Sequence, residues 1–224
     1  MSSPRPAILI LGGTGTVGSR IAHQLSSPSH SAHNVLIASR SVGLMTSFVE
    51  YALDRGVRRF VLQSASSIEA GGPAMGKVVH LRGIREESKI YSATGDGKIP
   101  WVSADDIAAV AVRALTNKEA PNTEYMVLGS ELLSYGEIAS ILSEVLGRRI
   151  VHVDLSPADL EQRHRSFGMP DDYARMMSAM DTSIKFGSEN RTNDVILAIT
   201  GAAPKKFRDF AVSVKDVWET GDRF

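Results

Sequence analysis

The feature that most constrains the fold is a glycine-rich turn between a short apolar run and a helical pattern. Residues 8–11 are continuously apolar, and from Val17 to Leu25 apolar residues recur at helical spacing. Glycines here let a pyrophosphate approach backbone N–H groups at a helix start and let the helix pack closely on the strand. The sequence therefore predicts a dinucleotide site, the alternative being a plain glycine-rich loop. The predicted contacts are Gly12, Gly13, Thr14, Gly15, Thr16, Val17 and Gly18.

Further along, short apolar runs alternate with helical patterns. A capping box, Ser134 with Glu137, opens a predicted helix that ends at Gly147, and Asp105 with Asp106 opens another. We expect an α/β protein, with a Rossmann-type doubly wound parallel sheet over residues 1–150 and a small, mostly helical C-terminal lobe over 151–224. The predicted strands are 8–11, 35–38, 59–63, 101–103, 124–128 and 150–153.

Two stretches are too short for this architecture. A crossover between parallel strands takes a dozen or more residues, usually a helix. Near residues 41–42 there is no room for one, and around 79–84 a helix start runs into a polar stretch without the strand that should follow. We therefore hypothesise that segments are missing at these two places.

The residues after the second predicted strand set the cofactor preference. An acid there would bind a ribose 2′-hydroxyl, but the chain has Ser39 and Arg40, which suit a 2′-phosphate. The sequence thus predicts NADP(H) rather than NAD, unless Arg40 is simply a solvated cation. Other predicted cofactor contacts follow a strand or begin a helix on the same side, with a serine-rich turn and a surface lysine as the alternatives. They are Ser64, Ala65, Ser66 and Lys77.

Composition excludes several classes of partner and site. Lys plus Arg and Asp plus Glu both number 25, and no basic run is present, so neither nucleic acid nor a membrane surface is expected. The absence of cysteine excludes disulfides and thiolate chemistry. We interpret His80, His152 and His164 as structural or surface residues, because their spacing is not that of metal ligands. A soluble cytoplasmic protein without a metal site is expected.

The catalytic residues stay unknown at this level. No tyrosine is followed four residues later by lysine, so the usual short-chain dehydrogenase route to carbonyl reduction is unsupported. The C-terminal tail has a Met- and aromatic-rich side that could form a wall for a bulky apolar substrate, although such a side also suits helix packing. The predicted wall residues are Phe167, Met169, Tyr173 and Met176.

Several motifs together resemble the NmrA-like, atypical short-chain dehydrogenase family. They are the glycine turn, residues 38–40, the run GKIPWVSADDIA at 97–108 and the ending TGAAPKKFRDF at 200–210. Residues 125–129, 131–135, 166–170 and 189–194 are similar to the fungal ergot-alkaloid reductase subgroup. The resemblance implies hydride transfer from NADPH to a cyclic iminium in an alkaloid of secondary metabolism. An NADP(H)-sensing regulator and a quinone or enone reductase remain open as alternatives.

Overall fold

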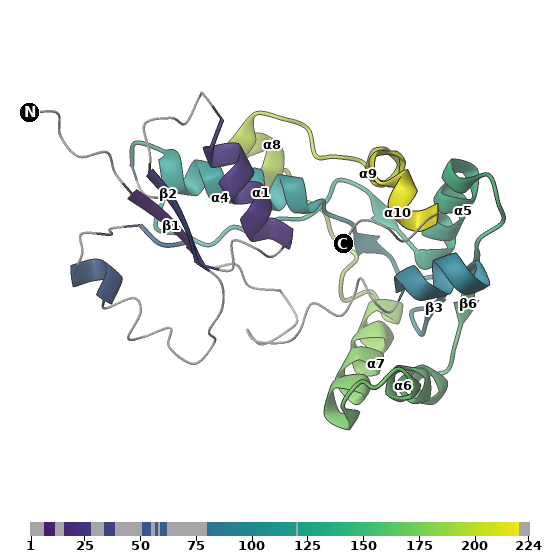
Figure 1. Cartoon of the computed structure of the whole chain (residues 1–224). Coiled ribbons are helices and arrows are strands. Elements are labelled where there is room, and N and C mark those ends of the chain that lie inside the picture. Colours follow the sequence, from purple (N-terminus) through teal and green to yellow (C-terminus); the bar gives the residue numbers. More distant parts are fainter. Residues whose placement is uncertain are drawn as a thin grey trace, which may run out of the picture. The chain divides into compact units, whose positions relative to one another are not determined.

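The computed structural model describes residues 7–11, 16–27, 34–38, 51–54, 57, 59–61, 80–119 and 121–219. The chain divides into two compact units, and each is treated separately (Figure 1). The first unit contains Met1–Gly71, Ser103–Val127 and Asp194–Pro204, and the second contains Gly72–Val102, Leu128–Asn193 and Lys205–Phe224. The predicted boundary at 150/151 stays a prediction. So does the hypothesis of missing segments, since residues 41, 42 and 79 lie outside the described ranges.

The first unit is built around a parallel strand pair with a helix between its strands. Strand β1 (Ala7–Leu11) pairs in register with β2 (Asn34–Ala38), and α1 (Thr16–Leu25) joins them. Helix α4 (Ala104–Thr116) packs against α1, and α8 (Val195–Thr200) packs against α4. The core residues are Ile8, Val17, Ile21, Ala22, Leu25, Ala108, Ala111 and Val112. The apolar positions predicted at helical spacing therefore face this core.

Helix α4 begins with a serine cap rather than with the predicted aspartates. The Ser103 side chain accepts a hydrogen bond from the backbone N–H of Asp106, at 3.1 Å. Asp105 instead pairs with Arg20 of α1, with 2.5 Å between Nε and Oδ1, and its carbonyl accepts from Gln24. The negative charges of Asp105 and Asp106 thus stabilise the N-terminus of α4 by interacting with the helix dipole. Asp105 also links α4 to α1 through its ion pair with Arg20.

We expect Ser103→Ala to lower the free energy of unfolding by about 1 kcal/mol, because an N-cap hydroxyl satisfies a backbone donor that has no intrahelical partner. Denaturant unfolding measures the change. Ser140→Ala is the control, since Ser140 lies inside a helix and its hydroxyl only back-bonds to the Gly136 carbonyl. Equal stabilities of the two variants would contradict the capping role.

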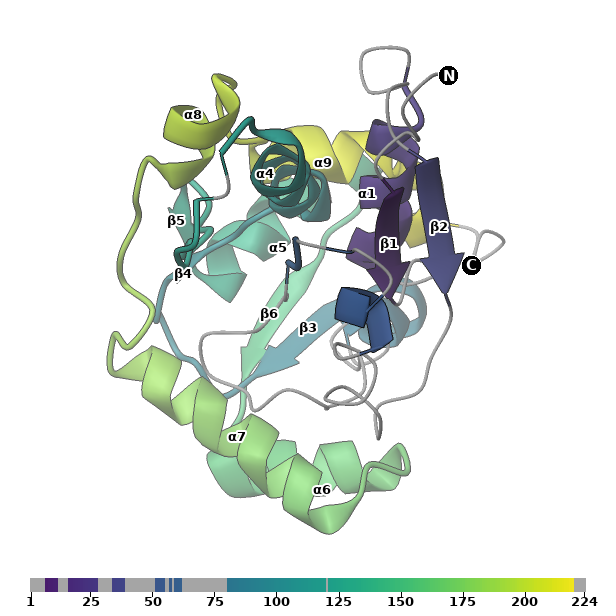
Figure 2. The ribbon, with the colours of Figure 1, turned by 90° about the vertical axis from the view of Figure 1, so that its left-hand side faces the viewer.

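The second unit has two small strand pairs covered by helices (Figure 2). Strand β3 (Lys89–Ser92) runs parallel to β6 (Val151–Asp154), while β4 (Ile99–Pro100) is antiparallel to β5 (Leu132–Leu133). Helix α5 packs on β3 and β6, α9 packs on α5, and α6 packs along α7. The helices are η3 (Gly83–Glu87, a π-helix), α5 (Tyr135–Leu146), α6 (Pro157–Ser166), α7 (Asp171–Lys185), α9 (Phe207–Ser213) and α10 (Lys215–Glu219).

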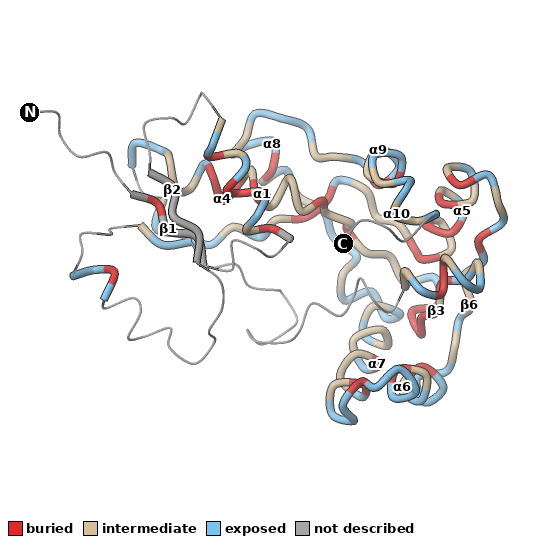
Figure 3. Tube along the Cα trace, in the orientation of Figure 1, coloured by how far each residue is buried: buried red, intermediate tan, exposed pale blue. Residues whose placement is uncertain are grey.

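The core of the second unit lies between α5, β3 and α9 (Figure 3). Ile90 and Leu142 are each 1% exposed, and Phe207 and Tyr135 close the cluster with their rings. Trp101 packs edge-on against both rings and donates its indole N–H to the Leu133 carbonyl, at 2.9 Å. This core fixes α5 over the β3–β6 pair.

Three predicted strands differ from the structure, and in the first of them, 59–63, the described residues 59–61 form no strand. Residues 101–103 do not form a strand, because the chain leaves β4 at Pro100 and Ser103 already caps α4. Residues 124–128 have no sheet partner within the described part of the chain. The α/β class, the capping box at Ser134 and the helix end at Gly147 are confirmed. No helix in the described ranges has the length and apolar character needed to cross a membrane.

Candidate functional site

The first unit contains the strand and the helix that flank the predicted dinucleotide-binding residues. Strand β1 ends at Leu11 and α1 begins at Thr16, and β2 then returns parallel to β1. Four residues separate the strand from the ten-residue helix, and the start of such a helix fits a pyrophosphate bound by backbone N–H groups. Val17 is 9% exposed and packs in the core, so only its backbone can face a ligand.

Most of the predicted cofactor contacts lie outside the described residues. Thr16, Val17 and Gly18 form the first turn of α1, and the structure describes none of the other predicted contacts. These others are Gly12, Gly13, Thr14, Gly15, Ser39, Arg40, Ser64, Ala65, Ser66 and Lys77. Their assignment to the cofactor remains a prediction.

A buried polar cluster lies at the carboxyl end of β3 in the second unit. Ser92, the last residue of β3, has its Oγ 2.7 Å from Nε2 of His152 and 2.9 Å from the hydroxyl of Thr94. The Tyr135 ring stacks on His152, and its hydroxyl lies 3.2 Å from Nε2 of His80. We call these five residues the polar cluster. Its position matters because open parallel sheets bind ligands at the carboxyl ends of their strands.

Helix α7 closes onto the loop that follows β3. Asp181 accepts a hydrogen bond from the backbone N–H of Ala93, at 2.8 Å, and Asp154 accepts one from Gly95, at 2.9 Å. Gly97 lies so close to α7 that an added Cβ would stand 2.4 Å from the Ile184 carbonyl oxygen. The loop is therefore held against the last two turns of α7.

Burial controls the ionisation of the groups gathered here. It lowers the pKa of His80 to about 4, with smaller contributions from the imidazoles of His164 and His152, and it lowers the pKa of His152 as well. Burial raises the pKa of Tyr135, and the carboxyl group of Asp181 raises that pKa further. Burial also raises the pKa of Asp181 to about 6, against the opposing Ala93 N–H. Near neutral pH, Asp181 is therefore ionised, whereas the polar cluster is neutral.

The predicted substrate wall follows α6 and begins α7. Phe167 is 41% exposed, and its ring lies 5.0 and 5.2 Å from the guanidinium carbons of Arg163 and Arg82. Met169 is only 4% exposed, whereas Tyr173 and Met176 are half-buried on α7. The exposed Phe167 ring is accessible to a ligand. Met169 is enclosed by the protein, so its side chain packs in the interior. Their role as a substrate wall stays a prediction.

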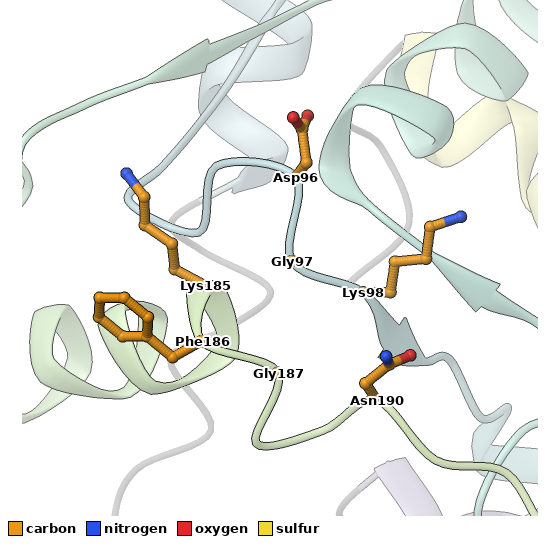
Figure 4. Close-up of a pocket in the computed structure, with 7 residues that line it drawn as sticks. All are labelled: Asp96, Gly97, Lys98, Lys185, Phe186, Gly187 and Asn190. Carbon is orange, nitrogen blue, oxygen red and sulfur yellow. The ribbon is translucent and has the colours of Figure 1, made fainter.

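A shallow pocket of about 530 Å³ lies between the loop before β4 and the end of α7 (Figure 4). Its lining combines an aromatic ring, charged groups and one amide. Phe186 is 83% exposed, so its ring is available to a ligand. Lys98 is paired with Glu137 at 3.0 Å and Lys185 with Asp154 at 3.7 Å. The lining residues are Asp96, Gly97, Lys98, Lys185, Phe186, Gly187 and Asn190.

The sequence interpretation missed this part of the second unit. Ser92, Thr94 and Asp181 carried no recognisable motif, and His152 was assigned a structural or surface role. The pairing of β3 with β6, which joins Ile90 to His152, brings Ser92 to His152, and Asp181 reaches the loop after β3 from α7. Within the described ranges, no group of three or more His, Asp or Glu side chains is placed to hold a metal ion.

Comparison with known proteins gives the family. The sequence profile of the NmrA-like family matches residues 57–207. The chain belongs to the NmrA-like family. Festuclavine synthase II of Penicillium roqueforti is 42% identical over 202 residues, which cover 78% of this chain and 70% of that protein. Agroclavine dehydrogenase of Claviceps fusiformis is 42% identical over 200 residues, covering 76% and 69%. The predicted relationship to the ergot-alkaloid reductase subgroup is confirmed.

A solved structure supports the fold of this NmrA-like chain. The triphenylmethane reductase of Citrobacter sp., complexed with NADP(H), superposes with a TM-score of 0.68 over 93% of this chain and 99% of that chain, at 18% identity. At that identity the likeness concerns the fold alone. It confirms the predicted Rossmann-type α/β architecture.

Proposed function

We propose that this NmrA-like protein is a cytoplasmic NADPH-dependent reductase that transfers a hydride to the C=N carbon of a cyclic iminium in a bulky, alkaloid-type heterocycle. Its class is an NADP-dependent oxidoreductase. The observation that carries the proposal is 42% identity to a festuclavine synthase in a chain with a glycine turn between a strand and a helix. A formal charge of zero offers no electrostatic attraction for nucleic acid or a membrane surface, which is consistent with a small-molecule substrate.

The roles of the chain's own residues follow from this assignment. Bound NADPH supplies the hydride. Residues 12–18 hold its pyrophosphate through backbone N–H groups, Ser39 and Arg40 hold the 2′-phosphate, and residues 64–66 with Lys77 complete the cofactor site. The wall from Phe167 to Met176 excludes water and orients the heterocycle. An iminium is already activated, so the absence of a tyrosine–lysine pair is consistent with this reaction.

The test of the function is NADPH oxidation with three substrate classes, a cyclic iminium, a quinone and an enone. We expect turnover of the iminium and a clear excess of its kcat/KM over those of the other two. Preferred turnover of the quinone or the enone would replace the proposed reaction by the corresponding reduction. Tight NADPH binding without turnover of any of the three would identify a sensing regulator.

We expect Arg40→Ala to weaken NADPH binding by roughly ten-fold or more and to leave NADH binding nearly unchanged, because the guanidinium contacts the 2′-phosphate that NADH lacks. Dissociation constants for both cofactors measure the effect. Arg113→Ala, which removes an exposed arginine of α4, is the control. Equal losses for NADPH and NADH would remove Arg40 from the phosphate site.

A further inference from the structure

Strand β6 of the second unit has an open outer edge. The N–H groups of Val151 and Leu155 donate to carbonyls at the two ends of β3, at 3.0 and 2.8 Å. Because the backbone groups of successive strand residues point in opposite directions, those of His152 and Asp154 face away from β3. Within the described part of the chain, no residue forms a hydrogen bond with the backbone N–H or C=O of either residue on this outer side.

The open edge is short and is limited at both ends. At its start, the Ile150 N–H donates to the Ser143 hydroxyl of α5 at 2.8 Å, and that hydroxyl lies 3.2 Å from the Ile150 carbonyl oxygen. At its end, Ser156 already caps α6. Between these ends, His152 and Asp154 each keep an outward N–H and an outward C=O. A strand edge with such groups accepts the edge of another strand.

We propose that the open edge of β6 pairs with the same edge of a second copy of the chain, as antiparallel strands related by a two-fold axis at Val153. In this register His152 lies opposite Asp154 of the second copy, and each such pair exchanges two N–H···O=C bonds. All the outward groups of these two residues are then used. The contact is closed, so it produces a dimer and not a growing chain of copies.

Apolar side chains on one face of the joined strands fit this register. Val151, Val153 and Leu155 share a face of β6 and keep exposed surface, with Val151 37% exposed. The two-fold axis places Val153 opposite its own copy and Val151 opposite Leu155 of the second copy. Pairing therefore removes a row of apolar side chains from water.

On the other face, helix α5 leaves room for its own copy. A groove of about 530 Å³ lies between α5 and residues 149–152, and its lining on α5 consists of small residues, Gly136, Ala139, Ser140 and Ser143. Helix α5 packs on both β3 and β6, so it lies about half a strand spacing inside β6. The axis then sets α5 and its copy roughly 10 Å apart, a distance at which helices pack through small side chains.

Charge favours a second copy over an unrelated strand. Arg149 precedes β6, is exposed and forms no ion pair with a described residue. Because the paired strands are antiparallel, Arg149 lies beside the end of the other β6, where Asp154 and Asp159 carry negative charge. Opposite charges thus meet at both ends of the contact.

The first experiment measures the mass of the full chain in solution by analytical ultracentrifugation, from sub-micromolar concentrations to about 100 µM. We expect a monomer–dimer equilibrium. Amide hydrogen exchange in the same samples should slow at His152 and Asp154 as the dimer forms, because their N–H groups become bonded. A monomer at every concentration would overturn the proposal. A dimer in which these two amides exchange as fast as in the monomer would overturn it equally.

Two variants test the contact itself. Ser140→Arg places a long charged side chain at an exposed position of the groove, and Arg149→Glu puts an acid beside Asp154 and Asp159 of the second copy. We expect each variant to raise the dissociation constant of the dimer roughly ten-fold or more. Thermal unfolding of dilute samples establishes that both variants fold.

Lys206→Glu is the matched control, since it makes the same change of charge at an exposed residue outside β6 and the groove. It should dimerise as the wild type does. Unchanged dimerisation in both Ser140→Arg and Arg149→Glu would place the contact on another surface and overturn the proposal. Equal weakening by Lys206→Glu and Arg149→Glu would also contradict it, because net charge alone would then control association.

Discussion

Gly129→Ala is expected to destabilise the second unit by about 3 kcal/mol or more, because a side chain at this position has no space. A Cβ on Gly129 would stand 1.8 Å from the Trp101 carbonyl oxygen and 2.5 Å from its carbon, both backbone atoms. The two segments cannot easily separate. The Gly129 N–H donates to the Pro100 carbonyl, and the Trp101 indole is bound to Leu133.

Tryptophan fluorescence during denaturant unfolding measures this effect selectively. The chain has two tryptophans, Trp101 and Trp218, and both belong to the second unit. Gly136→Ala is the matched control. Its Cβ would meet only the Ser134 hydroxyl at 3.7 Å, and alanine favours the α5 helix by up to about 1 kcal/mol. A Gly129→Ala variant as stable as Gly136→Ala would contradict the close approach.

Acidification is expected to destabilise the second unit through His80. Burial lowers its pKa in the folded protein from 6.5 to about 4. Between these values the unfolded chain binds a proton that the folded chain does not, so stability falls as the pH falls from 6.5 toward 4. The full loss is at most roughly 3 kcal/mol. His152 and His164, whose pKa values burial also lowers, act in the same direction.

Asp181 acts in the opposite direction. Its pKa is raised from 3.8 to about 6, so the folded chain takes up a proton first, and stability rises as the pH falls through 6. The measurement is the unfolding free energy, followed by tryptophan fluorescence, at pH 7 and pH 5. We expect His80→Gln to lose less stability than the wild type over this interval and Asp181→Asn to lose more.

His23→Gln, which changes an exposed histidine of α1, is the control and should behave as the wild type does. The same pH response in His80→Gln and His23→Gln would show that His80 is not protected from protonation in the folded protein.

The elements predicted correctly from the sequence depend on neighbouring residues. The capping box of Ser134 and Glu137 starts α5, and Gly147 ends it with a φ of +65°. In the same way, an apolar run, a glycine turn and a helical pattern suffice to predict β1, α1 and the parallel return of β2. In a helix cap, the side chains and backbone groups that form hydrogen bonds with the helix end lie within a few residues of it in the sequence.

The elements that the sequence analysis missed depend on residues far apart in the chain. The Ser92–His152 contact requires the β3–β6 pairing, and the need for glycine at 129 arises only where the chain crosses Trp101.

The family motifs, the α/β class and the helix ends marked by local caps can be predicted from neighbouring residues, because turns and caps are short-range interactions. Which polar groups meet at the end of β3, and that Asp181 forms no ion pair within the described residues, becomes visible only in the folded chain. Burial, and with it the pKa values of His80 and Asp181, depends on segments that only the folded chain brings together.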